Sequence, residues 1–251
     1  MKIDLNCDLG ESFGAYTIGS DTEVIKNITS ANVACGFHAG DPLVMAKTVA
    51  TCKALNVAVG AHPGHPDLVG FGRRVLDVSP DEAKASVMYQ VGALNAFCVA
   101  NGIKMQHVKP HGALYNQAGK DYALAKAICE GVKAVDDSLI LLGLAGSAML
   151  TAAKDLGLQF RSEVFADRGY EDDGSLVKRG KPGAMITDEA EAIARVIRMV
   201  KEGVVKTVTG KDIEIHADSV CVHGDGAKAL AFVASLKAEF IKNGIVLASM
   251  K

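Results

Sequence analysis

Basic clusters and paired-cysteine motifs are both missing from this sequence. The 251 residues contain 27 Lys and Arg against 29 Asp and Glu, a formal charge of −2, and no basic cluster extends beyond local pairs such as Arg73-Arg74. Nucleic-acid binding therefore has no electrostatic support. The six cysteines are widely spaced and form no C-x-x-C pair. This spacing favours free thiols in a reducing, cytoplasmic compartment.

Long apolar segments are missing as well. The longest stretch, Leu139 to Leu150, is interrupted by Gly143, Gly146 and Ser147 and is too short to cross a bilayer. Near the amino terminus, Asp4 lies where a signal peptide would need an apolar core. We therefore expect neither secretion nor a membrane partner.

Apolar residues are nevertheless abundant, and they fall in alternating short and long segments. They make up 49% of the chain, enough for a large core. Short β-branched or apolar runs alternate with longer segments of helical period, which is typical of β/α units and a parallel sheet. We predict strands near residues 2–7, 30–35, 57–61, 105–109, 139–144, 160–166 and 218–223. We predict helices near residues 21–28, 41–55, 80–101, 121–135, 147–157, 188–202 and 226–242.

The number of these units favours a closed barrel over an open sheet. An α/β barrel has roughly 250 residues, and a short strand at 245–248 would follow the seven units. The doubly wound alternative lacks its G-x-G-x-x-G after the first strand. We see no domain boundary and predict a single domain over residues 1–251, an α/β barrel of the TIM-like (β/α)7 type. The Gly-rich segment 167–186 exceeds the usual connection length, which favours a functional lid.

Polar side chains occupy one face of the first predicted strand. Asp4, Asn6 and Asp8 share that face, while the alternate residues are apolar. If the apolar face packs on the helices, the polar face points into the barrel, where each group must be paired or functional. A solvent-exposed edge strand is the alternative. Glu11, just beyond the strand, either serves the site or caps the next helix.

Four predicted strands end in a histidine that glycine follows closely. These histidines are His38, His62, His111 and His223. A lone histidine at a strand end is more often a capping or core group. Four equivalent ends, however, meet at one mouth of a barrel, the face where barrel enzymes keep their sites. We therefore expect the four rings to converge.

Other charged groups follow the same strand ends. Lys109, two residues before His111, is suited to stabilise negative charge or to pair with Asp8; a solvated lysine is the alternative. Arg168 is suited to bind a substrate carboxylate, although Asp167 and Arg168 could equally form a structural ion pair.

Residues in the predicted loops have weaker functional signals. We assign Asp41, which precedes a proline, to helix capping. Tyr115 and Tyr170 are expected to be solvated surface. The glycine-flanked Phe71 has two interpretations, solvated surface or part of a second loop that folds over the mouth.

Several of these segments resemble the LamB/YcsF family. The resemblance covers IDLNCDLGESFG at 3–14, SANVACGFHAGDP at 30–42, GAHP at 60–63, GFGRR at 70–74, VKPHGALY at 108–115, EVFADR at 163–168 and CVHGD at 221–225. It spans nearly the whole chain, and these motifs are too long to be accidental. Gly64-His65 departs from the Ser-Tyr expected after His-Pro, so His65 is left out of the site.

The resemblance implies a distorted seven-stranded barrel similar to the glycoside hydrolase/deacetylase group. It also implies the A component of a bacterial ATP-dependent 5-oxoprolinase, which acts with subunits B and C. Together they would convert 5-oxo-L-proline to L-glutamate at the expense of ATP and water, with Mg²⁺ accompanying the ATP. We expect B and C to phosphorylate the lactam oxygen, because this chain has no P-loop. Ring opening would then fall to this chain.

Within that scheme we predict two sets of site residues. The catalytic set comprises Asp8 as general base or nucleophile, His62 and His111 as proton-transfer groups, and Lys109 as a stabiliser of the oxyanion. Roles within this set are interchangeable. The predicted substrate-binding set is Asn6, Glu11, His38, Asp167, Arg168 and His223.

Two alternatives stay open at this point. A stand-alone metal-dependent deacetylase or amidohydrolase would use Asp8, His38 and His62 or His111 as ligands, although no H-x-x-x-H or H-E-x-x-H helix supports it. A non-catalytic subunit would only bind a lactam for its partners. The sequence also leaves open a tightly bound metal and assembly into a homo-oligomer.

Overall fold

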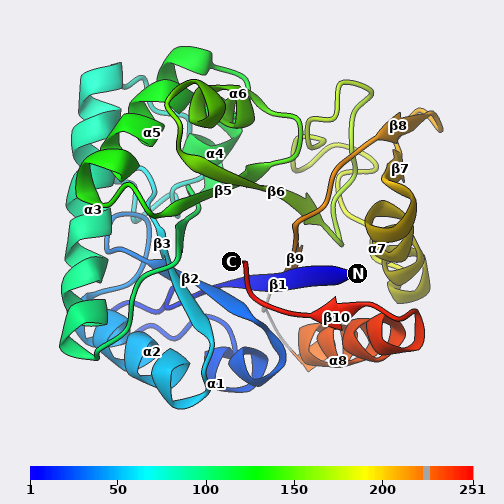
Figure 1. The fold of residues 1–251 in the computed structure, drawn as a ribbon, viewed down its shortest axis with the longest axis horizontal. Helices are drawn as coiled ribbons and strands as arrows, with labels where there is room; N and C mark the ends of the chain where they lie inside the picture. The colour runs from blue at the N-terminus through cyan, green and yellow to red at the C-terminus, as the bar shows by residue number, and fades with distance from the viewer. Residues whose placement is uncertain (223–226, 251) are drawn as a thin grey trace.

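A ring of parallel strands forms the centre of the molecule in a computed structural model that describes residues 1–222 and 227–250 (Figure 1). Seven strands follow one another in the order β1-β2-β3-β4-β5-β6-β9, and β9 pairs back onto β1 to close the barrel. The strands are β1 Lys2–Leu9, β2 Ser30–Ala34, β3 Ala58–His62, β4 His107–Val108, β5 Ile140–Leu144, β6 Gln159–Phe165 and β9 Ser219–Val222. The predicted TIM-like (β/α)7 barrel is confirmed.

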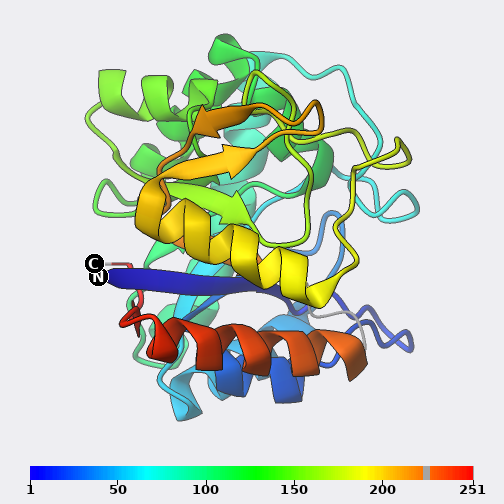
Figure 2. The ribbon, with the colours of Figure 1, turned by 90° about the vertical axis from the view of Figure 1, so that its right-hand side faces the viewer.

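Helices surround this barrel and bury its outer face. They are α1 Asp21–Val24 with the 3-10 turn η1 Ile25–Asn27, α2 Pro42–Ala54, α3 Pro80–Ala100, α4 Gly112–Ala118, α5 Tyr122–Val135, α6 Ala148–Asp155, α7 Glu189–Glu202 and α8 Ala227–Lys242. The view in Figure 2 shows α7 and α8 side by side along one flank. None of the helices in the described part of the chain has the length and apolarity that a membrane span requires.

Several helix starts follow from local capping chemistry. Asp41 accepts hydrogen bonds from the backbone N–H groups of Leu43 and Val44 at 2.8 and 2.9 Å, which confirms its assignment as a cap. Ser79 and Glu82 form a reciprocal capping box at the start of α3. These caps fix where α2 and α3 leave the strand-end loops that precede them.

The seven predicted barrel strands are all present, with boundaries within two residues of those expected. The predicted final strand is the two-residue β10 Val246–Leu247, which pairs with the first residues of β1. The sequence analysis missed α4 and the hairpin of β7 Val204–Lys206 and β8 Asp212–Glu214. Helix α4 begins at Gly112 with a φ of 51° and has no side-chain cap, so the usual start signals are lacking.

The polar face of β1 points into the barrel, as predicted. Strand β1 lies between β2 and β9, so the alternative of an exposed edge strand is wrong. At the lowest level, Asp4 accepts hydrogen bonds of 2.6 Å from both Ser30 Oγ and Thr29 Oγ1, and another from Ser219 Oγ. Burial raises the pKa of Asp4, and these three hydrogen bonds oppose that shift.

The middle level of the interior joins three neutral side chains. Asn6 Nδ2 donates to Ser219 Oγ at 2.8 Å, and Asn32 Nδ2 donates to Asn6 Oδ1 at 2.8 Å. His107 Nε2 lies 2.7 Å from Asn32 Oδ1 and donates to it. Burial, helped by the charge of Lys109, lowers the pKa of His107 to about 3, so this ring is neutral. These hydrogen bonds join the three side chains into a floor beneath the upper end of the barrel, in which only His107 Nδ1 has no hydrogen-bond partner.

The His107 ring fits only because β3 has a glycine opposite it. A Cβ atom at Gly60 would lie 2.2 Å from His107 Nε2, and the ring is fully buried with no space to retreat. We therefore predict that Gly60→Ala lowers the free energy of unfolding by about 1–3 kcal/mol through overpacking. Urea denaturation followed by circular dichroism measures this change.

The matched control is Gly92→Ala in the middle of α3, where nothing lies within 4 Å of the added Cβ. Alanine is the better helix former, so this variant should gain roughly 0.5–1 kcal/mol. Equal unfolding midpoints for Gly60→Ala and the unmodified protein would show that the ring is not confined as described.

Candidate functional site at the carboxyl end of the barrel

A cavity of ≈ 720 Å³ opens at the carboxyl ends of the barrel strands. Its wall includes the ends of β1, β3 and β6, the segment after β4, and loop residues 173–179. In Figure 2 the barrel strands run from left to right, so the loops that surround this cavity lie on the right. Six of the predicted site residues lie on this wall, and they come from four segments of the chain: Asp8 and Glu11, His62, Lys109 and His111, and Arg168.

Among the described residues that form ion pairs, Lys109 is the only cation that contacts the polar interior of the barrel. Its Nζ lies 3.0 Å from Asp8 Oδ1, 2.8 Å from Glu163 Oε1 and 3.2 Å from Cys221 Sγ. Burial by itself would lower the pKa of Lys109, but the negative charges of Asp8 and Glu163 outweigh it and raise the pKa well above its usual value. Its Nζ also lies 3.4 Å from Asn6 Oδ1, so the side chain is a buried ammonium ion with four polar neighbours. The predicted pairing of Lys109 with Asp8 is present.

Glu163 and Tyr115 belong to this cluster and were not in the predicted site. Tyr115 OH donates to Glu163 Oε2 at 2.7 Å, and both side chains are buried. Burial, together with the charge of Glu163, raises the pKa of Tyr115, so the phenol keeps its proton. The expectation that Tyr115 and Tyr170 are solvated surface is wrong. Tyr170 is fully buried as well, and its hydroxyl oxygen accepts a hydrogen bond of 2.9 Å from the backbone N–H of Phe165.

His62 and His111 face each other at the cavity wall, and backbone carbonyls fix both rings. His62 Nδ1 lies 2.7 Å from the carbonyl oxygen of Lys109, and His111 Nε2 lies 2.8 Å from that of Phe71. A carbonyl oxygen can only accept, so each of these ring nitrogens carries a hydrogen. The other two nitrogens, His62 Nε2 and His111 Nδ1, lie 2.9 Å from each other. His62 Nε2 also lies 3.3 Å from Asp8 Oδ2.

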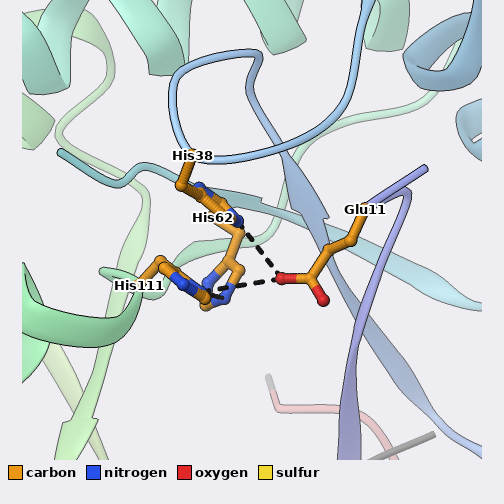
Figure 3. A group of neighbouring side chains, drawn as sticks. All are labelled: Glu11, His38, His62 and His111. Atoms are coloured by element: carbon orange, nitrogen blue, oxygen red, sulfur yellow. Dashed lines mark hydrogen bonds and ion pairs between the residues drawn. The ribbon is translucent and has the colours of Figure 1, made fainter. Parts of the chain in front are cut away.

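His38 and Glu11 complete the histidine cluster (Figure 3). The His38 ring stacks on that of His111, with centroids 3.7 Å apart and planes 5° from parallel. His38 Nε2 lies 3.2 Å from Glu11 Oε1, which is 3.6 Å from His111 Nδ1. One ligand atom from each of Glu11, His38, His62 and His111 falls within 4.8 Å of the others. Three of the four predicted histidines thus converge.

A glycine-flanked turn packs against this cluster from the cavity side. Phe71 has a positive φ of 54°, an unusual conformation for a bulky residue, and it presents its carbonyl to His111. At Gly72, a Cβ atom would lie 2.7 Å from His38 Cβ and 2.8 Å from His111 Cδ2. Phe71 and Arg73 both line the cavity. The interpretation of this segment as a second loop at the mouth fits these positions better than solvated surface does.

Of the remaining predicted substrate-binding residues that the structure describes, two lie off the cavity wall and the third has its polar atoms engaged elsewhere. Asn6 is fully buried beneath Asp8 and does not line the cavity, so we revise its role to positioning Asn32 and the floor. Asp167 is also absent from the cavity wall. Arg168 reaches the wall, but its Nε and Nη2 donate to the carbonyls of Ala184 and Val177 at 3.1 and 2.6 Å.

The contacts of Arg168 therefore revise its predicted role as a fork for a substrate carboxylate. Its guanidinium holds together the two ends of the long segment 167–186, and residues 173–179 of that segment line the cavity. The position of segment 167–186 beside the cavity agrees with its predicted role as a lid. Movement of this segment stays a prediction. His223 lies outside the described residues.

Comparison with known proteins shows that the chain is similar to proteins of a single family. The family model described as LamB/YcsF family matches residues 3–251. A protein from Clostridium beijerinckii, named as the A subunit of 5-oxoprolinase, is 67% identical over 236 residues, which cover 94% of this chain and 92% of that protein. A protein of the same name from Thermococcus sibiricus is 53% identical over 251 residues, covering 100% and 98%. The crystal structure of a lactam utilization protein from Thermus thermophilus superposes with a TM-score of 0.94 at 44% identity over 100% of both chains.

The Tyr115 to Glu163 hydrogen bond yields a stability prediction. Tyr115→Phe removes the donor and leaves a buried carboxylate oxygen without this partner, so we expect a loss of about 1–3 kcal/mol in the free energy of unfolding. Tyr122→Phe is the control, because its hydroxyl donates to Asp155 Oδ2 at the same 2.7 Å but at an exposed position. Urea denaturation of both variants should separate them by at least about 1 kcal/mol. Equal losses would contradict a buried, structurally required bond.

Proposed function

Because this chain belongs to the LamB/YcsF family, we propose that it is the component of a 5-oxoprolinase that opens the ring of 5-oxo-L-proline to give L-glutamate. The observation that carries this proposal is the position of Asp8 on the cavity wall. One carboxylate oxygen contacts the Lys109 ammonium at 3.0 Å, and the other lies 3.3 Å from His62. The chain is thus a hydrolase component whose activity depends on partner subunits.

Ring opening adds water across the cyclic amide. A new bond forms between the water oxygen and the ring carbonyl carbon, the carbon–nitrogen bond breaks, and the nitrogen gains a proton. Without activation, the products are a carboxylate and an amine on one open chain. When the ring oxygen carries a phosphoryl group, breaking the carbon–nitrogen bond gives an acyl phosphate, and a second water hydrolyses it to the carboxylate and inorganic phosphate. Asp8 is placed to take the first proton from water as a general base. His62, 3.3 Å from Asp8 and on the same wall, is placed to pass a proton toward the leaving nitrogen.

Lys109 acts on Asp8 more directly than on the substrate. Its Nζ donates to Asp8 Oδ1 and Cys221 Sγ and forms an ion pair with Glu163 Oε1 at 2.8 Å. An adjacent cation favours the ionised form of a carboxyl group, so Lys109 keeps Asp8 able to accept a proton. A substrate oxyanion that reached Nζ would have to replace one of its present contacts, of which the thiol is a weak acceptor. We therefore assign Lys109 first to positioning Asp8 and second to oxyanion stabilisation.

ATP activates the lactam in this proposal, with subunits B and C carrying out the phosphorylation in the presence of Mg²⁺. The sequence of this chain lacks the P-loop that would cradle a nucleotide phosphate. The cavity of ≈ 720 Å³ is far larger than a five-membered lactam needs, and Arg73, Lys178 and Arg179 line it. These cationic side chains suit an anionic ligand such as a phosphorylated lactam with its carboxylate.

A stand-alone metal-dependent amidohydrolase is the second candidate function. The cluster of Glu11, His38, His62 and His111 favours it, because imidazole and carboxylate groups are ligands of catalytic zinc. In that case the chain alone would hydrolyse an amide without ATP. The two candidates therefore differ in their need for partners.

Reconstitution separates the two candidates. Glutamate release from 5-oxoproline and Mg-ATP is measured with this chain alone, with subunits B and C alone, and with all three. We expect glutamate only from the complete mixture. Glutamate release by this chain alone, independent of ATP, would support the metal-dependent amidohydrolase instead. Full release by B and C alone would show that this chain takes no part in the reaction.

Replacement of Asp8 tests its role as the base. Asp8→Asn keeps the size of the side chain but removes the proton acceptor, so kcat of the reconstituted enzyme should fall by roughly 10²-fold to 10⁴-fold. Asp137→Asn serves as the control and should leave kcat unchanged. Asp137 is exposed and lies just before β5, so it is at the opposite end of the barrel from the cavity. A kcat for Asp8→Asn equal to that of the control would remove Asp8 from the mechanism.

A further inference from the structure

Two ring nitrogens face each other at the cavity wall. The backbone carbonyls of Lys109 and Phe71 fix the hydrogens on His62 Nδ1 and His111 Nε2. If both rings are neutral, His62 Nε2 and His111 Nδ1 each present a lone pair, and these atoms are 2.9 Å apart. Two acceptors at this distance repel each other. Something positive must lie between them or beside them.

The geometry around these nitrogens suits a metal ion. Bonds from a first-row metal ion to a histidine nitrogen are about 2.1 Å long. Two such nitrogens on one ion are therefore about 3.0 Å apart at the right angle of octahedral coordination and about 3.4 Å apart at the tetrahedral angle that zinc prefers. The observed 2.9 Å agrees with the right angle and is shorter than the tetrahedral spacing. A carboxylate oxygen, Glu11 Oε1, lies 3.6 Å from His111 Nδ1 and within 4.8 Å of the ligand atom of His62. A shared proton would explain the two nitrogens but would give no reason for this third ligand atom.

The surroundings of the three ligand atoms are those of a metal site. A metal-bound histidine usually donates its other ring N–H to a carbonyl or carboxylate, and both His62 and His111 do so here. His38 Nε2 lies 3.2 Å from Glu11 Oε1 and orients that carboxylate. Glu11, His62 and His111 all line the cavity, so an ion has a path from solvent.

We propose that His62 Nε2, His111 Nδ1 and Glu11 Oε1 bind one first-row divalent metal ion, with His38 as the residue that positions Glu11. Imidazole ligands favour Zn²⁺, Fe²⁺, Co²⁺ or Ni²⁺ over Mg²⁺, which prefers oxygen ligands. The ion would be separate from the Mg²⁺ that accompanies ATP. Asp8, whose Oδ2 is 3.3 Å from His62 Nε2, lies beside this site. An ion on Nε2 would occupy the lone pair that His62 needs for proton transfer, so with the metal bound Asp8 is the group that passes the proton to the leaving nitrogen.

Metal binding to the isolated full chain tests the proposal without any assay of activity. The protein is stripped with a chelator, dialysed, and titrated with Co²⁺ followed by visible absorption, and the Zn²⁺ content is measured by elemental analysis after equilibrium dialysis. We expect one ion per chain and no comparable uptake of Mg²⁺. Saturating Zn²⁺ should also raise the melting temperature of the protein by about 5 °C or more.

Variants assign the ligands. His62→Gln and His111→Gln should each weaken Co²⁺ binding by at least about 100-fold, while His216→Gln, an exposed histidine remote from the cavity, should bind like the unmodified protein. His38→Gln should keep the stoichiometry of one but bind roughly 10-fold to 100-fold more weakly, because it only orients Glu11. Circular dichroism without metal shows whether each variant is folded.

Two results would overturn the proposal. One is an unmodified protein that retains no stoichiometric Zn²⁺ or Co²⁺, which would leave a shared proton between the rings. The other is equal metal affinity in the folded His111→Gln and His216→Gln variants, which would place the ion elsewhere. Because the readout is binding, either result is independent of whether the chain opens a lactam.

Discussion

The buried ammonium of Lys109 is the group around which the upper barrel is organised. Removing a charge from water costs several kcal/mol even after the protein relaxes, so the ion needs close acceptors. Asp8 and Glu163 supply them at 3.0 and 2.8 Å from strands on either side of β9. The same contacts hold Asp8 at the cavity wall beside a cation. Stability and the proposed chemistry therefore depend on one set of ion pairs.

A second constraint comes from space at the strand ends. The histidine rings pack so tightly that glycine is required beside them: a Cβ at Gly64 would lie 2.6 Å from His38 Nδ1, and one at Gly72 would lie 2.8 Å from His111 Cδ2. This packing holds the rings of His62 and His111 with one nitrogen of each toward a backbone carbonyl and the other toward the cavity side. The proposed metal site and the proposed base are thus adjacent parts of one rigid wall. A metal bound there would supply Lewis acidity next to Asp8.

Much of this arrangement follows from sequence patterns, because parallel strands bring their carboxyl ends to one mouth. Alternation along β1 placed Asp8 inside the barrel, and the histidine–glycine pairs located His62 and His111. The same alternation puts Glu163 on one face with Phe165, and it could have identified that residue. Tyr115 could not be found this way, because α4 lacks start signals. Nor does any local pattern show that Arg168 turns its guanidinium to the carbonyls of its own loop, since that contact depends on the tertiary path of residues 177–184.

A double-mutant cycle on Lys109 and Glu163 tests the central claim most directly. Lys109→Met should be strongly destabilising because it leaves two carboxylates facing each other, and adding Glu163→Gln should recover part of that loss. The free energies of unfolding should therefore be non-additive by about 1–3 kcal/mol. Losses that add to within about 0.5 kcal/mol would show that the two groups do not depend on each other, and would contradict the account.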